Sequence, residues 1–186
     1  MTNFLPKNYE TPETPSNYLR LEEGKNTIRI LSSAIVGYQY WTEDEEGNRK
    51  PTRVHTFEEC PDDVRRSKDS RQRAKHFWAF VVYSYENKRV QILELTQKTI
   101  MRSIETLVKD ENWGDPKEYN IMIGRTKTGN RDMDVEYSVM PQPKKAFKED
   151  INYQPEDIDL EALYQNEDPF EDRAGEKLAK EVAGKI

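Results

Sequence analysis

The stretch from Lys75 to Tyr85, KHFWAFVVYSY, constrains the fold more than any other part of the chain. It is rich in aromatic and β-branched residues, and a second such run, Val90–Leu95, follows after a short polar link. Two strand-like runs joined this closely are typical of an antiparallel hairpin. The first run is apolar at both alternating positions, so it has two apolar faces. One face therefore fills a core, and the other presents aromatic rings to something else.

Charge is distributed unevenly along the 186 residues, whose formal net charge is −6. Residues 151–186 contain four basic and ten acidic side chains, so this end carries the whole excess and residues 1–150 are neutral. A block of like charge at one end is typical of a disordered interaction tail. The single cysteine excludes an internal disulfide, and neither a membrane-spanning apolar run nor a signal-peptide pattern occurs. We therefore expect a soluble protein of the cytoplasm.

The sequence divides into three parts: an extended, proline-containing arm over 1–17, one domain over 18–148, and an acidic, largely disordered tail over 149–186. Leu178 and Val182 in the tail have the spacing of a short terminal helix. Within the domain, strands are expected at Thr27–Leu31, continuing from Ala34 to Trp41 after a bend at Ser32 and Ser33, and at 75–85, 90–95, 119–123 and 133–140. A helix with Thr96 as its N-cap, and Ile100, Ile104, Leu107 and Val108 on one side, ends before Asp115.

This order predicts an all-β protein, a five-stranded barrel with one helix between the third and fourth strands, which is the order of an OB-fold. A 33-residue polar loop, Thr42–Ala74, joins the first two strands. A different small barrel shares the same order of elements, so this alternative stays open. OB-folds bind oligonucleotides on their second and third strands and the loops beside them. The aromatic hairpin would form these two strands.

The run from Arg65 to Lys75 contains six basic residues and one acid, and it leads directly into the aromatic strand. Single-stranded nucleic acid needs cations for its phosphates and rings for its unstacked bases. Pairing Tyr85 with Val90 and Tyr83 with Ile92 places Trp78, Phe80 and Val82 in the core, and Phe77, Tyr83 and Tyr85 on the binding face. A slip of one residue would reverse this assignment. The candidate DNA-binding residues are Arg29, Tyr38, Tyr40, Trp41, Arg65, Arg66, Lys68, Arg71, Arg73, Lys75, Phe77, Tyr83, Tyr85, Lys88, Arg89, Lys127 and Arg131.

Several short hydrophobic runs resemble those of phage single-stranded DNA-binding proteins, the family typified by the helix-destabilising protein of T-even phages. They are Ile28–Leu31, the later Trp41, Phe77–Tyr83 and Gln97–Ile100, and the resemblance covers roughly residues 20–140. It implies an OB-fold, sequence-tolerant binding of single strands during replication and recombination, and an acidic C-terminal region that contacts partner proteins. The T-even type also carries a zinc site of one His and three Cys. Here only His55, Cys60 and His76 are present, so we expect no metal and no cofactor.

Residues 149–172 contain ten acids, no Lys or Arg, and interspersed apolar residues. Acids mixed with apolar anchors suit docking on basic grooves of replication or recombination proteins, and such a tail can also lie over the protein's own cationic face. A disordered tail that only aids solubility is the alternative. The candidate partner-binding residues are Asp157, Asp159, Glu167, Asp168, Phe170, Glu171 and Asp172. DNA or RNA preference, the binding-site size and assembly of several copies on DNA stay open.

Two other functions are compatible with parts of the sequence. Pro61-Asp62 with Glu86-Asn87-Lys88 mimics the motif of metal-dependent nucleases, but the second group falls on the expected hairpin turn. Asp132, Asp134 and Glu136 alternate along one strand and are typical of a solvated face. We therefore expect no enzyme. The second alternative is a protein-interaction barrel that uses the aromatic face as a docking surface.

Overall fold

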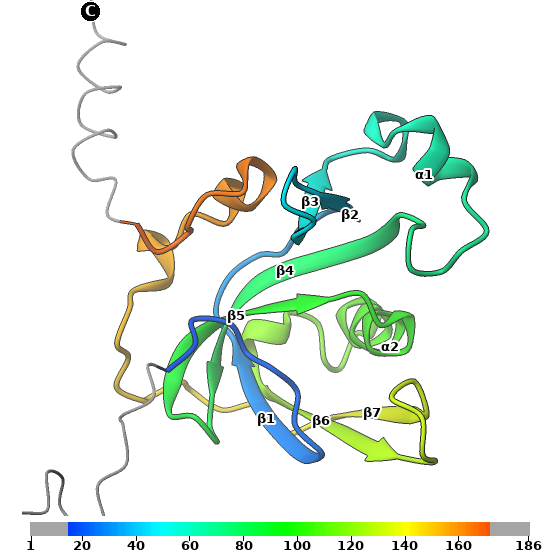
Figure 1. The fold of residues 1–186 in the computed structure, drawn as a ribbon. Helices are drawn as coiled ribbons and strands as arrows, with labels where there is room; N and C mark the ends of the chain where they lie inside the picture. Colours follow the sequence, from blue (N-terminus) through cyan, green and yellow to red (C-terminus); the bar gives the residue numbers. More distant parts are fainter. Residues whose placement is uncertain (1–14, 172–186) are drawn as a thin grey trace, which may run out of the picture.

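The protein is described by a computed structural model that covers residues 15–171. It is mostly β, with an antiparallel sheet of seven strands and few helices (Figure 1). The strands are β1 (Gly24–Ile30), β2 (Ile35–Glu43), β3 (Arg49–Val54), β4 (Lys75–Ser84), β5 (Arg89–Leu95), β6 (Asn120–Lys127) and β7 (Val135–Pro141). The helices are α1 (Asp62–Arg66) and α2 (Lys98–Lys109), with short 3-10 turns η1 (Phe57–Glu59), η2 (Pro116–Glu118), η3 (Pro155–Asp157) and η4 (Leu160–Gln165).

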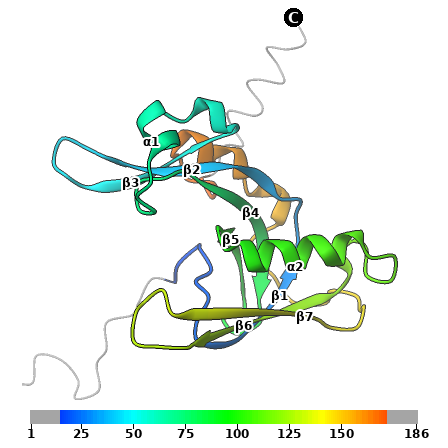
Figure 2. The same cartoon turned by 90° about the vertical axis from the view of Figure 1, so that its right-hand side faces the viewer.

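Strand β4 is the centre of the sheet, and the strand order is β3-β2-β4-β1-β6-β7 with β5 also paired to β4. One edge of β4 pairs with β5, and the other edge pairs with β2 over its first half and with β1 over its second half. The predicted bend at Ser32 and Ser33 is confirmed, because it separates β1 from β2. The sheet is not closed into a barrel. The β2–β3 ribbon lies at one end of the molecule and the β6–β7 hairpin at the other (Figures 1 and 2).

The structure contains two more strands than the five that we expected. One arises because the predicted first strand is divided at its bend. The other, β3, lies within the region expected to be a loop and pairs with β2 around a turn at Asp44–Asn48. Its sequence, RKPTRV, is basic and contains a proline, so it lacks the composition of a strand. Only residues 55–74 remain as an irregular connection, and they contain η1 and α1.

Helix α2 covers one face of the sheet and closes the first core. Ile100 and Ile104 are buried among Phe80 and Val82 of β4 and Leu93 of β5, as their helical spacing predicted. The helix ends at Lys109, before Asp115, also as predicted. The N-cap is Gln97 rather than Thr96, and no side chain caps the first turn.

The β4–β5 register differs from the prediction by two residues. Tyr83 pairs with Val90 and Val81 with Ile92, because the turn includes Tyr85 and places Lys88 in the left-handed region with φ of 53°. A shift of two residues keeps every side chain on the same face, whereas a shift of one would exchange the faces. Phe80 and Val82 therefore still face α2, as predicted.

A second core lies on the opposite face of β4 and β5, where residues 147–170 cross the sheet. We call these residues the covering segment. Ile158, Leu160 and Leu163 of this segment are buried against Phe77, Ala79, Val81, Tyr83, Val90 and Ile92. The prediction of a largely disordered tail is therefore wrong for the described part, since apolar residues among the acids bury against the sheet. The predicted terminal helix over 173–186 lies outside the described residues.

The start of the described chain extends the sheet at the outer edge of β5. The Leu19 amide donates to the carbonyl oxygen of Ile92 at 2.8 Å, and the Ile92 amide donates to that of Asn17 at 2.9 Å. Residues 15–17 of the expected arm therefore lie close to the sheet, whereas 1–14 lie outside the described residues. No helix in the described chain has the length and apolarity to cross a membrane.

Candidate nucleic-acid interface

The aromatic face predicted to bind bases is covered in this structure. Phe77 is fully buried and Tyr83 is 5% exposed, because the covering segment packs over both. The Phe147 ring lies 5.4 Å from the Tyr83 ring. Tyr85 is half-buried, and its hydroxyl donates to Asn120 Oδ1 at 3.2 Å. These three rings therefore contact the protein's own chain, and they are not available to a ligand in this arrangement.

Aromatic residues of the β2–β3 ribbon are more accessible. Trp41 is 43% exposed, and the Arg49 guanidinium lies 5.7 Å from its ring centre. Tyr38 is half-buried between the rings of Phe57 and His76, at 5.4 and 5.2 Å. Trp41 is thus the predicted ring that the structure leaves best placed to receive a base.

Tyr40 lies near the connection that follows the ribbon. Burial raises the pKa of its phenol, and the nearby Cys60 and Asp63 raise it further. The phenol therefore stays neutral at physiological pH. Tyr40 belongs to the face of the ribbon opposite Trp41, because successive strand residues alternate.

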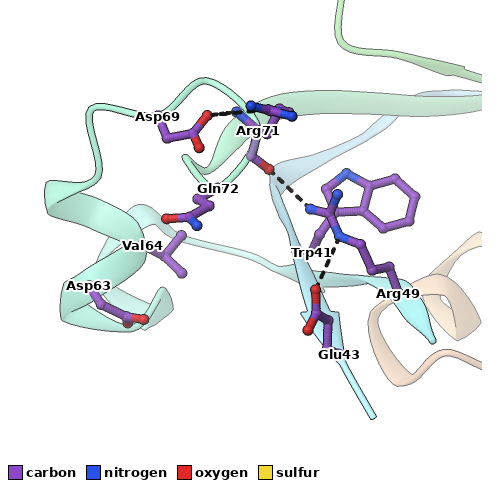
Figure 3. A pocket seen from close by; sticks show the side chains of 8 residues that line it. All are labelled: Trp41, Glu43, Arg49, Asp63, Val64, Asp69, Arg71 and Gln72. Atoms are coloured by element: carbon purple, nitrogen blue, oxygen red, sulfur yellow. Dashed lines mark hydrogen bonds and ion pairs between the residues drawn. The ribbon is translucent and has the colours of Figure 1, made fainter. Parts of the chain in front are cut away.

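A cavity of about 470 Å³ opens beside Trp41 (Figure 3). It is lined by Trp41, Glu43, Arg49, Asp63, Val64, Asp69, Arg71 and Gln72. Arg49 lies 3.9 Å from Glu43 and donates to the backbone carbonyl oxygen of Arg71 at 3.4 Å, while Arg71 lies 3.7 Å from Asp69. These ion pairs are exposed and therefore contribute little to stability. Both arginines can exchange their carboxylate partners for a phosphate at small cost.

Cations without a carboxylate partner lie along the chain near the residues that line this cavity. Within the described chain, the exposed residues Lys50, Arg66, Lys68, Arg73 and Lys75 form no ion pair. Four of them belong to the run from Arg65 to Lys75 that the sequence singled out. Asp69, Arg71 and Gln72 of this run line the cavity beside the exposed Trp41, whereas the predicted ring Phe77 is buried.

Sequence reasoning missed several residues of this region, namely Arg49, Lys50 and the 36% exposed Phe57. The signal for the first two was present, because a basic pair follows the Asp44–Asn48 turn a few residues after Trp41. Arg49 and Lys50 were not predicted as binding residues, because no strand was expected at Arg49–Val54.

The remaining predicted cations either bond within the protein or lie elsewhere. Arg29 is 1% exposed and is bonded within the protein. Arg65 pairs with Asp62 in α1, and Arg89 donates to Asn17 Oδ1 at 3.1 Å. The others, Lys88 in the β4–β5 turn, Lys127 at the end of β6, and Arg131 in the β6–β7 turn, are exposed, and Arg131 pairs with Asp134 at 2.9 Å. Because β7 and β3 end the strand order on opposite sides, Lys127 and Arg131 are not brought to the ribbon.

The predicted partner-binding acids lie mostly on the outside of the covering segment. Asp157, Glu167, Asp168 and Glu171 are exposed, while Asp159 is half-buried and accepts a hydrogen bond from the Glu161 amide at 3.2 Å. Phe170 is also half-buried, with its ring 5.0 Å from that of Tyr153. Asp172 lies outside the described residues. The segment thus anchors by its apolar residues and presents its acids outward.

The covering segment also contacts the ribbon. The rings of Tyr164 in η4 and His55 after β3 stack at 3.8 Å with an angle of 20° between them. His55 Nε2 lies 3.7 Å from Glu161 Oε2, although both side chains are largely exposed. Burial raises the pKa of the Tyr164 phenol, and Glu161 and Glu59 raise it further. These contacts fix the ribbon against the segment.

The residues of the nuclease-like motif do not form a common site. Both oxygens of the Glu86 carboxylate accept from the Thr27 amide, at 2.9 and 3.0 Å, while Asp62 is engaged by Arg65 in α1. Arg131 holds the pKa of the Asp134 carboxyl below its usual range through a hydrogen bond. Among residues 15–171, no three side chains of His, Cys, Asp or Glu gather in a way that suits a metal ion.

Comparison with known proteins adds no assignment, because no family model, curated protein or solved structure matches this chain.

Proposed function

We propose that this chain binds single-stranded DNA without strong sequence preference, through the β2–β3 ribbon and the basic connection over 55–74. The observation that carries the proposal is the exposed Trp41 ring, which lies beside Arg49 and Arg71. A base stacked on an aromatic ring contributes about 1–3 kcal/mol, and unpaired cations nearby supply the contacts to phosphates. Double-stranded DNA does not present its base faces, so this combination favours single strands.

The order and pairing of the strands support an OB-type arrangement as the scaffold, with a sheet that stays open. Strands β1 and β2 act as one bent first strand, which pairs with β4 and, at its other edge, with β6. Helix α2 follows the third strand, β5, and precedes the fourth, β6. OB-folds have this order and bind nucleic acid beside their second and third strands. The β2–β3 ribbon would then be an elaboration of the bent first strand and the following loop.

In the proposed mechanism, one base stacks on Trp41 while Arg49 and Arg71 exchange their carboxylates for a phosphate. Lys68, Arg73 and Lys75 follow the backbone of the strand on either side. The protein is not an enzyme in this proposal, and it acts in the cytoplasm during phage DNA replication or recombination. The outward-facing acids of the covering segment support a role in contacting basic surfaces of partner proteins.

The deciding experiment is a titration of the full chain with oligo-dT, followed by tryptophan fluorescence without Mg²⁺. We expect quenching that weakens as salt rises, because phosphate contacts release counterions. Trp41→Ala should weaken binding by about 5- to 150-fold, the equivalent of removing one stacked base, and Trp41→Phe should retain most of it. Absence of binding at low salt would contradict the proposal. Fragmentation of the oligonucleotide that EDTA stops would indicate a nuclease instead.

A second candidate, a protein-interaction module, is favoured by an apolar groove between β2, β4 and α2. The groove has a volume of about 360 Å³, and Trp78, Ile104 and Val108 are among its lining residues. Val36 and Val108 are 51% and 46% exposed, an unusual arrangement for apolar side chains that lie close together. The same titration distinguishes the two candidates, since this module would not bind oligo-dT.

A further inference from the structure

Arg29 of β1 is an almost fully buried cation, and no residue of 15–171 forms an ion pair with it. It is 1% exposed, and its Nε donates to Asn120 Oδ1 at 2.8 Å. Its Nη1 and Nη2 atoms donate to the backbone carbonyl oxygens of Lys117 and Lys145, at 3.3 and 2.9 Å. All these acceptors are neutral, and no described carboxylate forms an ion pair with it. Burial of a charge is costly unless an opposite charge compensates it.

The guanidinium retains hydrogen-bonding capacity. It carries five N–H groups, and the three bonds named above use one group on each nitrogen. It also lies 5.8 Å from the ring of Phe147, which supplies only a weak electrostatic attraction. The surroundings thus enclose the side chain and accept three of its hydrogen bonds, but these acceptors carry no negative charge to balance the guanidinium.

A shallow cavity of about 480 Å³ opens above Arg29. Its lining includes the cationic residues Arg29, Lys117, Lys144 and Lys145 and one acid, Glu118. Lys144 pairs with Glu118 at 2.9 Å, and Lys117 lies 3.8 Å from Asp115 outside the cavity. Lys145 is exposed, and its ammonium lies 5.7 Å from the Tyr85 ring centre without forming an ion pair with a described residue. The cavity beside Trp41 differs, since acids there outnumber arginines.

We propose that this cavity binds a phosphate group. Lys145 and Lys117 make the direct contacts at the rim, and Arg29 supplies charge from beneath, where low dielectric strengthens its attraction. A bound phosphate provides the paired negative charge that no described carboxylate supplies to Arg29. Lysine and arginine together are well suited to phosphate oxygens.

The phosphate has two sources, a free phosphate group or a phosphodiester of a DNA strand. Tyr83 and Lys75 lie on the same face of β4, because residues alternate along a strand. Arg29 pairs with Tyr83 and Gln39 pairs with Lys75, so both lie on that face. Trp41, two residues after Gln39, lies there too. The covering segment crosses that face between the two positions. The DNA phosphodiester as a source rests on the proposed function, whereas the phosphate site itself does not.

The test is a titration of the ¹⁵N-labelled full chain with sodium phosphate, against sodium chloride of equal ionic strength. We expect saturable shifts of the amides of 117–118 and 144–147 with phosphate alone. The double variant Lys117→Gln, Lys145→Gln keeps both backbone acceptors of Arg29, and it should weaken phosphate binding at least about tenfold. Lys50→Gln at the ribbon is the matched control and should leave it unchanged. Linear shifts, or a double variant that binds like the parent, would overturn the proposal.

A second titration with oligo-dT identifies the source. Competition between oligo-dT and phosphate for the same amides would assign the site to a phosphodiester, whereas independent binding at the ribbon would assign it to a free phosphate. Phosphate binding by a chain that binds no oligo-dT would retain this site and refute the proposed function. Oligo-dT binding without phosphate-specific shifts would retain that function and refute this site.

Discussion

The hydroxyl group of Tyr164 donates a hydrogen bond to the backbone carbonyl oxygen of Val36 at 2.7 Å, across 128 residues of sequence. This bond fixes η4 to the first strand of the ribbon, and the stack on His55 fixes it to the end of the second strand. The covering segment therefore determines how the ribbon is held.

Tyr164→Phe removes this hydrogen bond and keeps the ring. We expect a loss of about 0.5–1 kcal/mol in the free energy of unfolding, because the bond lies near the surface. Tyr164→Ala also removes the stack on His55 and the packing on Phe77, so the loss should reach about 3 kcal/mol. Urea denaturation followed by circular dichroism measures both. An alanine variant as stable as the parent would show that the segment does not anchor there.

Leu163→Ala tests whether the covering segment belongs to the folded core. Leu163 is 2% exposed, so its truncation should cost about 2–4 kcal/mol. Glu156→Ala, on the exposed surface of the same segment, is the control and should change stability by less than about 0.5 kcal/mol. A disordered tail would leave both variants equal to the parent in thermal denaturation. For the same reason, removal of 149–186 should destabilise the domain by uncovering Phe77 and Tyr83.

Arg53 and Glu94 connect the ribbon to β5 through an ion pair of 2.9 Å, with side chains that are only 10% and 22% exposed. Glu94→Ala leaves the guanidinium of Arg53 without its carboxylate, and we expect a loss of about 3 kcal/mol. Glu105→Ala breaks the exposed pair with Lys109 on α2 and should cost less than about 1 kcal/mol. Equal losses in denaturant titrations of the two variants would contradict this difference.

The basic connection should determine the salt dependence of oligonucleotide binding. Replacement of Lys68, Arg73 and Lys75 by Gln should reduce the slope of log affinity against log salt by about 0.7 for each phosphate that is no longer neutralised. Lys98→Gln and Arg102→Gln, on the exposed surface of α2, provide the control of the same charge type. If the control variants reduce the slope as much as the variants at Lys68, Arg73 and Lys75, the DNA follows another surface.

Tyr119 should make the protein sensitive to alkaline pH. Its ring is fully buried, and its hydroxyl has no hydrogen-bond partner in the described chain. Burial is the main cause that raises the pKa of its phenol in the folded state. The unfolded phenol ionises first, near pH 10, so stability is retained below that pH and lost as the pH rises towards the folded pKa. Tyr119→Phe should be neutral or stabilising at pH 7 and should reduce the loss between pH 9 and 11 in denaturation curves.

Sequence periodicity predicted the two apolar faces of β4 and the helix that covers one of them, but not the segment that covers the other. The alternation of Phe80 and Val82 with Phe77 and Val81 indicated two apolar faces, and both are buried. Ile100 and Ile104 identified what covers the first face. The covering of the second face could not be predicted, because Ile158, Leu160 and Leu163 are set among acids in a segment without regular strand or helix periodicity.

The ribbon was only partly predictable for a related reason. Trp41 and the cations of 65–75 were chosen as candidates from composition, and most of them are exposed in the structure. Strand β3 was missed because Arg49–Val54 is stabilised by pairing with β2 and by the Arg53–Glu94 ion pair, and not by strand propensity. Arg29 was assigned to the DNA surface from its charge alone, since the sequence does not reveal that β1 buries it.

The beginning of the described chain and Asn152 of the covering segment meet at the outer edge of β5. There the Ile92 amide donates to Asn17 and the Val90 amide donates to Asn152 Oδ1 at 2.7 Å. The second of these bonds cannot form during synthesis until residue 152 has left the ribosome. The sheet therefore emerges with the Val90 amide of this edge unpaired and its second apolar face uncovered, and a nascent chain in that state is exposed to aggregation. Expression yield should accordingly depend on how quickly the last part of the chain is translated.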